Sequence, residues 1–171
     1  MNNQDSYEPR FQGYVEGLKA ELQAGTDRGV VLTCASMLEV ALEDLLSAFL
    51  IDHSITKDLL RHPGKPLNGL ANRINMAFAM GLIIPSDRLT LDIVRDVGCE
   101  AASSARFELA RSEHATRIRD ADGRSEVKHT DHSDRDKLFH ITMACLSGIR
   151  HAIASIGGNR VMIRKTYVHE G

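Results

Sequence analysis

The stretch Gly64-Lys-Pro-Leu-Asn-Gly-Leu-Ala-Asn-Arg-Ile-Asn-Met-Ala-Phe-Ala-Met-Gly-Leu-Ile83 decides the fold class of this chain. Pro66 and Asn68 are residues that favour a turn. The apolar residues that follow recur every three or four positions, as they do on one face of a helix. Gly81 stands where a helix would end. The stretch therefore predicts a turn followed by a helix over 68–81.

The same helical spacing recurs on both sides of this stretch. Residues 28–51 form the most apolar segment, with an apolar stripe that covers more than half of a helix circumference, so we expect this helix at the centre of a bundle. Thr26 and Asp27 offer its N-cap. Further helices are expected at 7–24 and 57–61. Another is expected to begin at Pro85 with Ser86 as its cap, and a last one to run from Ser133 to a stop at Gly157-Gly158. The sequence thus predicts an all-α bundle of five or six helices.

Residues 115–130 break the helical rhythm. Their loose alternation around Asp122-Gly123, a common hairpin turn, predicts a small β-hairpin near 115–130. We expect a single helical domain over 1–171, with a flexible N-terminus at 1–6 and an extended tail at 159–171.

Composition places the chain among ordinary globular proteins. It has 171 residues, 43% of them hydrophobic and 26% charged, and its net charge of -2 gives no long-range attraction to nucleic acid or to an anionic membrane. Cys34, Cys99 and Cys145 are far apart and predict reduced, buried thiols. The polar N-terminus has no signal region, and no apolar run reaches 18 residues. We therefore expect a cytoplasmic protein with no membrane association.

The pattern PLxxLxxRIxxAxxxGLI, which spans 66–83, resembles the central segment of the bacterial mannitol repressor-like family. Three other segments, 27–46, 91–97 and 135–139, are similar to helices of that family. The resemblance covers most of residues 27–156. It implies a helical, non-enzymatic protein similar to transcriptional regulators, which acts through contacts with a protein or with an operator complex.

One segment departs from the family pattern. The family has Arg-Asn and then Ala-His where this chain has Gly98-Cys99 and then Ala102-Ser103. The family's segment also resembles the Arg-x4-6-His signature of HEPN ribonucleases, whose His serves as acid or base on a 2'-hydroxyl. Arg95 is present, but a lone Arg cannot transfer the proton. The alternative function is therefore a HEPN-like ribonuclease relative without catalysis, in a toxin or phage-defence setting.

Glu39 and Glu43 lie one turn apart on the apolar helix. The di-iron sites of helical bundles would also need Glu-x-x-His pairs on partner helices, and the chain has none. We expect instead a solvated face or a structural ion pair with Arg73 or Arg95 across the bundle.

Basic residues gather in the expected hairpin, where acidic residues alternate with them. Such alternation is typical of a solvated face, and contact with nucleic acid is the second interpretation. The candidate contacts are Arg117, Arg119, Arg124 and Lys128.

A group of histidines follows the expected hairpin. His129, His132 and His140, with Asp134 and Asp136 nearby, are the candidates for a metal site, but their spacing matches no closed site and acidic residues are expected as caps at a helix start. We therefore predict no metal and no cofactor. We expect a homo-oligomer, because the Ala- and Ser-rich stretch at 99–105 and the broad apolar helix leave more apolar surface than one small bundle hides. The resemblance implies a protein partner as well. Direct contact with nucleic acid is left open.

Overall fold

The computed structural model describes residues 3–124 and 132–167, with side chains over 11–124 and 132–156. This part of the chain holds seven α-helices and one 3-10 turn, and no strand. The helices are α1 (Asn3–Ala24), α2 (Asp27–Phe49), α3 (Ser54–Arg61), α4 (Leu70–Ala79), α5 (Pro85–Ser103), α6 (Ala115–Asp122) and α7 (Asp134–Tyr167), and the 3-10 turn η1 (Leu109–Arg111) precedes α6. The predicted all-α class is confirmed, with more helices than the five or six expected.

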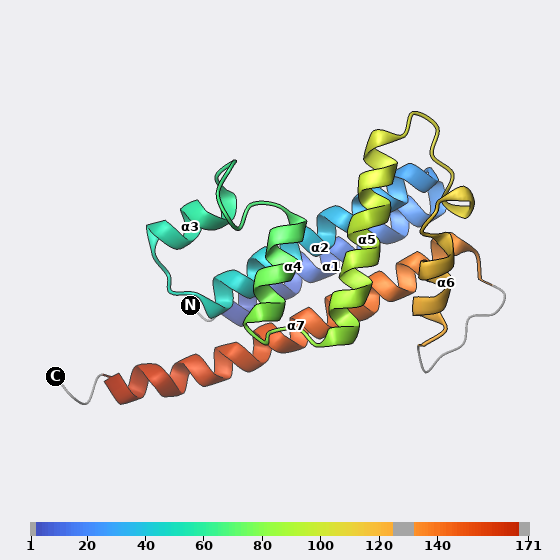
Figure 1. Ribbon diagram of the computed structural model, residues 1–171. Helices are drawn as coiled ribbons and strands as arrows, with labels where there is room; N and C mark the ends of the chain where they lie inside the picture. The colour runs from blue at the N-terminus through green and yellow to red at the C-terminus, as the bar shows by residue number, and fades with distance from the viewer. Residues whose placement is uncertain (1–2, 125–131, 168–171) are drawn as a thin grey trace.

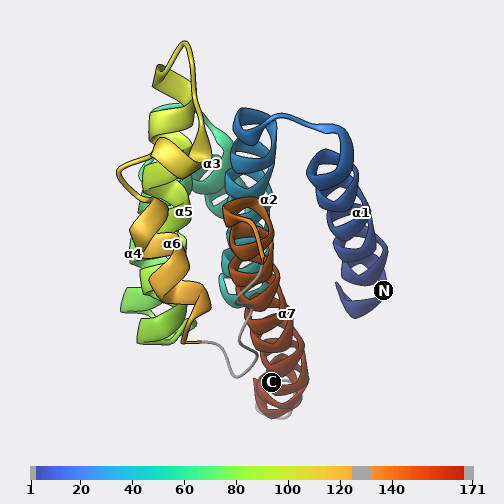
Figure 2. The same cartoon turned by 90° about the vertical axis from the view of Figure 1, so that its right-hand side faces the viewer.

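The helices form three layers. Figure 2 shows α2 and α7 side by side in the middle, α1 on one side of them, and α4, α5 and α6 on the other. Figure 1 shows α3 at one end of the molecule, far from α6 at the opposite end. Among the described helices, none combines the length and the apolar character needed to span a bilayer.

Helix α2 lies at the centre, as its wide apolar stripe predicts. Its buried side chains contact α1, α4, α5 and α7, so its apolar residues are covered from several sides. Thr26 is the N-cap: its Oγ1 accepts a hydrogen bond from the Gly29 amide at 3.0 Å. The short turn after α1 and this cap together fix where α2 begins.

The stretch that resembles the repressor-like family forms a turn and then α4, as its spacing predicts. Gly69 (φ +97°) precedes α4 and Gly81 (φ +68°) follows it, and both adopt the left-handed backbone that favours glycine. Ile74 and Ala77 of α4 are fully buried. The predicted cap of the next helix is wrong, because α5 begins at Pro85 after Ile84 and Ser86 is inside the first turn.

The predicted hairpin is wrong over 115–122, where the chain forms α6. Ala115, Ile118 and Asp122 are buried at helical spacing on one face of α6, and α6 packs on α7. Gly123 has φ -64°, whereas the hairpin turn that Asp-Gly favours needs positive φ. Tertiary packing of a short amphipathic face has thus overridden the turn signal. The rest of the expected hairpin, 125–131, lies outside the described residues.

The predicted chain ends also differ. Helix α1 begins at Asn3, so residues 3–6 are helical. The predicted stop at Gly157-Gly158 is wrong, since α7 continues to Tyr167 through most of the expected extended tail. Glycine costs a helix only about 1 kcal/mol relative to alanine, so a glycine pair weakens a long helix without ending it.

The cysteines divide into two kinds. Cys34 and Cys145 are buried as predicted, and burial raises the pKa of each thiol to about 12, which keeps both protonated and unreactive at neutral pH. The prediction is wrong for Cys99, which lies on the exposed face of α5.

Helices α2 and α5 approach closely at Gly98. A Cβ atom on Gly98 would lie 3.1 Å from Cβ of Ala35. Gly98 is buried, so no solvent space is open to a larger side chain there. This close approach lies one residue before the run of small side chains at 99–105, where the sequence suggests a tight helix contact.

Gly98→Leu should lower the free energy of unfolding by about 1–3 kcal/mol, because the added side chain overpacks the contact between α2 and α5. Gly13→Leu is the matched control, since nothing lies within 4 Å of a Cβ at Gly13 of α1. Urea unfolding of the two variants followed by circular dichroism measures the difference. Equal stability of the two variants would contradict a tight contact at Gly98.

Candidate functional site

The guanidinium of Arg73 is buried in the bundle and is surrounded by backbone carbonyls. Its Nη2 donates to the carbonyl oxygen of Leu60 at 2.7 Å, and its Nε donates to that of Leu67 at 3.1 Å. Its Nη1 donates to the carbonyl oxygen of Glu39 at 2.9 Å. One side chain of α4 therefore holds α2, the end of α3 and the loop between α3 and α4.

Two carboxylates neutralise this guanidinium. Glu43 Oε2 lies 2.9 Å from Arg73 Nη2, and Glu39 Oε1 lies 3.5 Å from Nη1. Arg61 of α3 donates from its Nε to the other oxygen of Glu43 at 2.7 Å. The structure thus brings Arg73 to both glutamates that the sequence analysis singled out. Arg95 is not part of this group.

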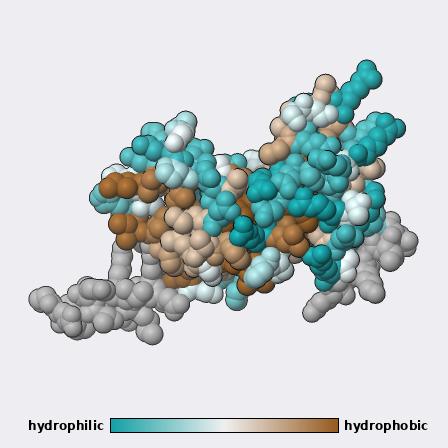
Figure 3. Space-filling view, viewed as in Figure 1, coloured by the Kyte–Doolittle hydropathy of each residue, from teal (hydrophilic) through white to brown (hydrophobic). Residues whose placement is uncertain are grey.

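The end of the molecule that Arg73 holds in place presents apolar side chains to solvent. Ile51, just before α3, is 72% exposed, and Ile55 of α3 is 61% exposed. Thr56 and Leu60 face inward from α3. We call residues 51–65 the α3 corner. Figure 3 shows hydrophobic side chains at the surface of this end of the molecule. Exposed isoleucines on an element whose inner face is already packed are typical of a contact surface.

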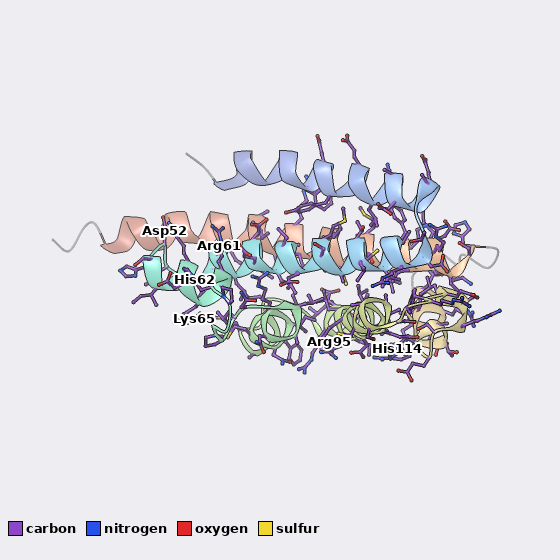
Figure 4. All side chains as sticks on the ribbon, turned by 90° about the horizontal axis from the view of Figure 1, so that it is seen from above. Asp52, Arg61, His62, Lys65, Arg95 and His114 are labelled. Carbon is purple, nitrogen blue, oxygen red and sulfur yellow. The ribbon has the colours of Figure 1, made fainter. Side chains whose placement is uncertain are left out.

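Three basic side chains belong to the same segment as the exposed isoleucines of the α3 corner. Lys57 and Arg61 lie on α3 and Lys65 follows it, and Figure 4 shows Arg61 and Lys65 beside His62 and Asp52 at this corner. Lys57 Nζ pairs with Asp52 at 3.3 Å, and His62 Nε2 pairs with Asp58 at 3.2 Å. The sequence analysis did not single out this corner. Ile51 and Ile55, four residues apart beside a short polar helix, were the available signal.

Arg95 lies in a second polar group, on α5. Its Nη1 donates to Asp92 at 2.6 Å, and its Nη2 and Nε donate to Asp96 at 2.6 and 3.0 Å. Arg117 of α6 donates to the other oxygen of Asp96 at 2.8 Å. Burial would raise the pKa of Asp96, but the hydrogen bonds from Arg117 and Arg95 and their charges together lower it.

His114 joins this group, although the sequence analysis did not single it out. Its Nδ1 lies 3.1 Å from Arg117 Nη1 and its Nε2 lies 3.4 Å from Glu113 Oε1. Since a guanidinium can only donate, Nδ1 accepts and the neutral ring carries its proton on Nε2. His114 and Arg117 are three residues apart, a spacing that brings side chains together only on a helix. Because this segment was predicted to be a hairpin, the pairing of His114 with Arg117 was not expected.

The HEPN-like positions on α5 are not arranged for catalysis. Gly98 is buried against α2, and Ala102 is exposed. Ser103 donates from its hydroxyl to the carbonyl oxygen of Cys99 at 2.9 Å, within its own helix. No proton-transferring side chain stands at these positions.

Three of the four candidate nucleic-acid contacts lie on α6 or just after it, and two of these pair with aspartates. Arg117 pairs with Asp96, and Arg119 pairs with Asp134 through two hydrogen bonds, from Nε at 2.7 Å and from Nη2 at 2.6 Å. Arg124 is exposed just after α6, and Lys128 lies outside the described residues.

The histidine candidates are only partly brought together. The rings of His132 and His140 have centroids 5.0 Å apart, and His140 Nδ1 lies 3.7 Å from Asp122 Oδ1. Asp136 instead forms a capping box with Ser133 at the start of α7: its carboxylate accepts from the amide and hydroxyl of Ser133, and Ser133 Oγ accepts from the Asp136 amide at 3.2 Å. In the described part of the chain, no three His, Cys, Asp or Glu side chains are grouped so as to hold a metal ion. His129 lies outside that part.

Comparison with known proteins identifies a similar fold but no matching family. No protein-family profile matches the chain. No curated protein sequence matches it either. Among solved structures, the chain is similar to one in the X-ray structure of the MtlR-HPr complex from Escherichia coli, with a TM-score of 0.50 and 16% identity over 85% of this chain and 99% of the other. At this identity the similarity shows a shared helical fold alone.

Arg73→Ala should lower the free energy of unfolding by about 3–5 kcal/mol, because it leaves Oε2 of Glu43 and the carbonyl oxygens of Leu60 and Leu67 without the donor they have now. For a chain of this size that corresponds to a fall of roughly 10 °C in Tm. Differential scanning calorimetry measures it. The control is Arg111→Ala, since Arg111 makes an exposed pair with Glu108 that contributes at most about 1 kcal/mol. A fully stable Arg73→Ala protein would refute the structural role of Arg73.

The pair between Asp134 and Arg119 should make stability depend on pH in acid. The hydrogen bonds from Arg119 lower the pKa of Asp134 in the folded chain below its ordinary value of 3.8. The stabilisation is therefore complete well above pH 3.8 and is lost as the pH falls through the lower, folded-state pKa. Thermal melts of wild type and Asp134→Asn should differ in Tm at pH 7, and the difference should shrink as the pH falls below 3.8 towards the folded-state pKa. A difference that persists unchanged at low pH would contradict this assignment.

Proposed function

We propose that this protein is a non-enzymatic regulator, similar in kind to mannitol repressor-like proteins, that acts by binding another protein. The observation that carries the proposal is the α3 corner. Ile51, just before α3, and Ile55, on α3, are exposed there, while the inner face of α3 is packed and its end is bonded to the buried Arg73. A fixed apolar surface with polar side chains around it is the usual form of a protein contact site.

The shared fold supports this proposal. The similar solved chain belongs to a complex between MtlR and HPr, so a bundle of this kind can dock a protein partner. The pattern at 66–83, which includes Arg73, is the part of this chain that most resembles the repressor-like family. In this chain that pattern builds the support of the α3 corner.

A HEPN-like ribonuclease relative is the second candidate, and the group around His114 favours it. His114, Arg117 and Arg95 combine a proton-transferring ring with two cations, which is the set of groups that cleavage beside a 2'-hydroxyl requires. Asp96 bonds both arginines and offsets their charge. We therefore expect no cleavage of labelled single-stranded RNA by the purified protein. Cleavage that His114→Ala abolishes would make the nuclease the leading function.

The proposed function is tested by crosslinking in the native host. A photo-crosslinking amino acid in place of Ile55 should give an adduct with one defined protein, because the partner covers this side chain. The same amino acid in place of Lys19, an exposed residue of α1, is the matched control. Mass spectrometry identifies the adduct, and calorimetric titration of the purified partner into wild type and Ile55→Ser then compares their affinities.

Two results would refute a protein-binding function at this corner. One is the absence of any adduct specific to position 55. The other is equal affinity of wild type and Ile55→Ser for the identified protein. The expected homo-oligomer is a separate prediction, which light scattering on a sizing column measures with and without added RNA and DNA.

A further inference from the structure

The charges around the exposed isoleucines indicate what kind of partner the α3 corner fits. Between residues 51 and 65 the chain has three basic side chains, Lys57, Arg61 and Lys65, against two acidic ones, Asp52 and Asp58. The whole chain, in contrast, has a formal charge of -2. Glu43 of α2 bonds Arg61 from the inner side and is only 16% exposed, so the charge that the corner presents to solvent has a small positive excess.

The acidic residues of the corner hold their cations only weakly. The pair between Lys57 and Asp52 has side chains that are 64% and 77% exposed. Ion pairs so open to water are weak and exchange readily for another carboxylate. Lys57 can therefore exchange Asp52 for a carboxylate of a partner at little cost in free energy.

Arg61 is oriented to bind a carboxylate of such a partner. Only its Nε is bonded, to Glu43 at 2.7 Å, and this bond fixes the direction of the side chain. Its two terminal amino groups make no other hydrogen bond within the described residues, and the side chain is 60% exposed. A guanidinium held at one edge and open at the other can accept a carboxylate in bidentate geometry.

We propose that the α3 corner binds a protein surface that has apolar side chains at its centre and carboxylates at its edge. Ile51 and Ile55 supply the apolar contact, and Lys57, Arg61 and Lys65 pair with the acidic edge. This inference rests on the proposed function and adds the chemistry of the partner. Complementary charge at the edge of an apolar contact selects the partner and speeds association more than it tightens binding.

The test uses three fluorescein-labelled helical peptides and the full-length protein. All three peptides have the same leucine stripe, flanked by Glu in the first, Gln in the second and Lys in the third. Fluorescence anisotropy should show that the Glu peptide binds about tenfold more tightly than the Gln peptide, that the Lys peptide binds most weakly, and that the preference shrinks as salt is added. Ile55→Ser should weaken binding of the Glu peptide.

Charge-reversal variants assign the preference to the corner. The double variant Lys57→Glu with Lys65→Glu should lose the preference for the Glu peptide, and neither lysine contacts the bundle core. The control double variant, Lys19→Glu with Arg106→Glu, makes the same change of charge at exposed sites on α1 and after α5. It should keep the preference for the Glu peptide.

Several outcomes would overturn the proposal. Equal or tighter binding of the Gln or Lys peptide would leave a protein-binding corner but refute an acidic partner. Failure of the Glu peptide to bind at about millimolar concentration would refute the docking chemistry, whereas the crosslinking experiment at Ile55 tests the proposed function independently of charge. A dimer that Ile55→Ser dissociates in sedimentation runs without peptide would show that a second copy of the chain covers the corner.

Discussion

The burial of one guanidinium, that of Arg73, is the constraint on which one end of this structure depends. Removing a cation from water costs several kcal/mol, so the surrounding chain must supply charges and acceptors in good geometry. Glu39 and Glu43 supply the charge, and three backbone carbonyls supply the remaining acceptors. The carbonyl of Leu60 belongs to the last turn of α3, where helix carbonyls have no partner in their own helix. Arg73 thereby satisfies an end of α3 that would otherwise need water, and α3 is held against α2 and α4.

Polar groups elsewhere on the bundle are paired with one another. Arg95 and Arg117 share Asp96, Arg119 is held by Asp134, and Asp136 caps α7. These pairs join neighbouring helices and offset most of the charge on the α5 and α6 face. The α3 corner differs, because it combines exposed isoleucines with exposed cations, of which Lys57 is held only by a solvent-exposed aspartate. This difference is the basis of the proposed protein-contact function.

Much of the fold could be predicted from residue spacing, because long amphipathic segments have few alternatives. The wide apolar stripe of α2 indicated a central helix, and Gly81 marked the end of α4. Short segments were harder to predict. Asp122-Gly123 suggested a hairpin, yet burial of Ile118 against α7 makes the segment helical. The pairing of His114 with Arg117 could not be foreseen, since it exists only if that segment is a helix.

The sequence by itself determined the all-α class, the order of the long helices, and the choice of Arg73, Glu39 and Glu43 as an ion-pair group. These follow from periodicity and from the physical requirement that a charged residue among apolar ones find a partner. Only the tertiary structure decided which partner each arginine takes: Arg73 reaches across to α2, whereas Arg95 bonds aspartates on its own helix and shares one of them with α6. It also decided that the side chains of Ile51 and Ile55 remain exposed to solvent. Exposure and charge pairing depend on which helix faces meet in space, and spacing along one chain does not specify that.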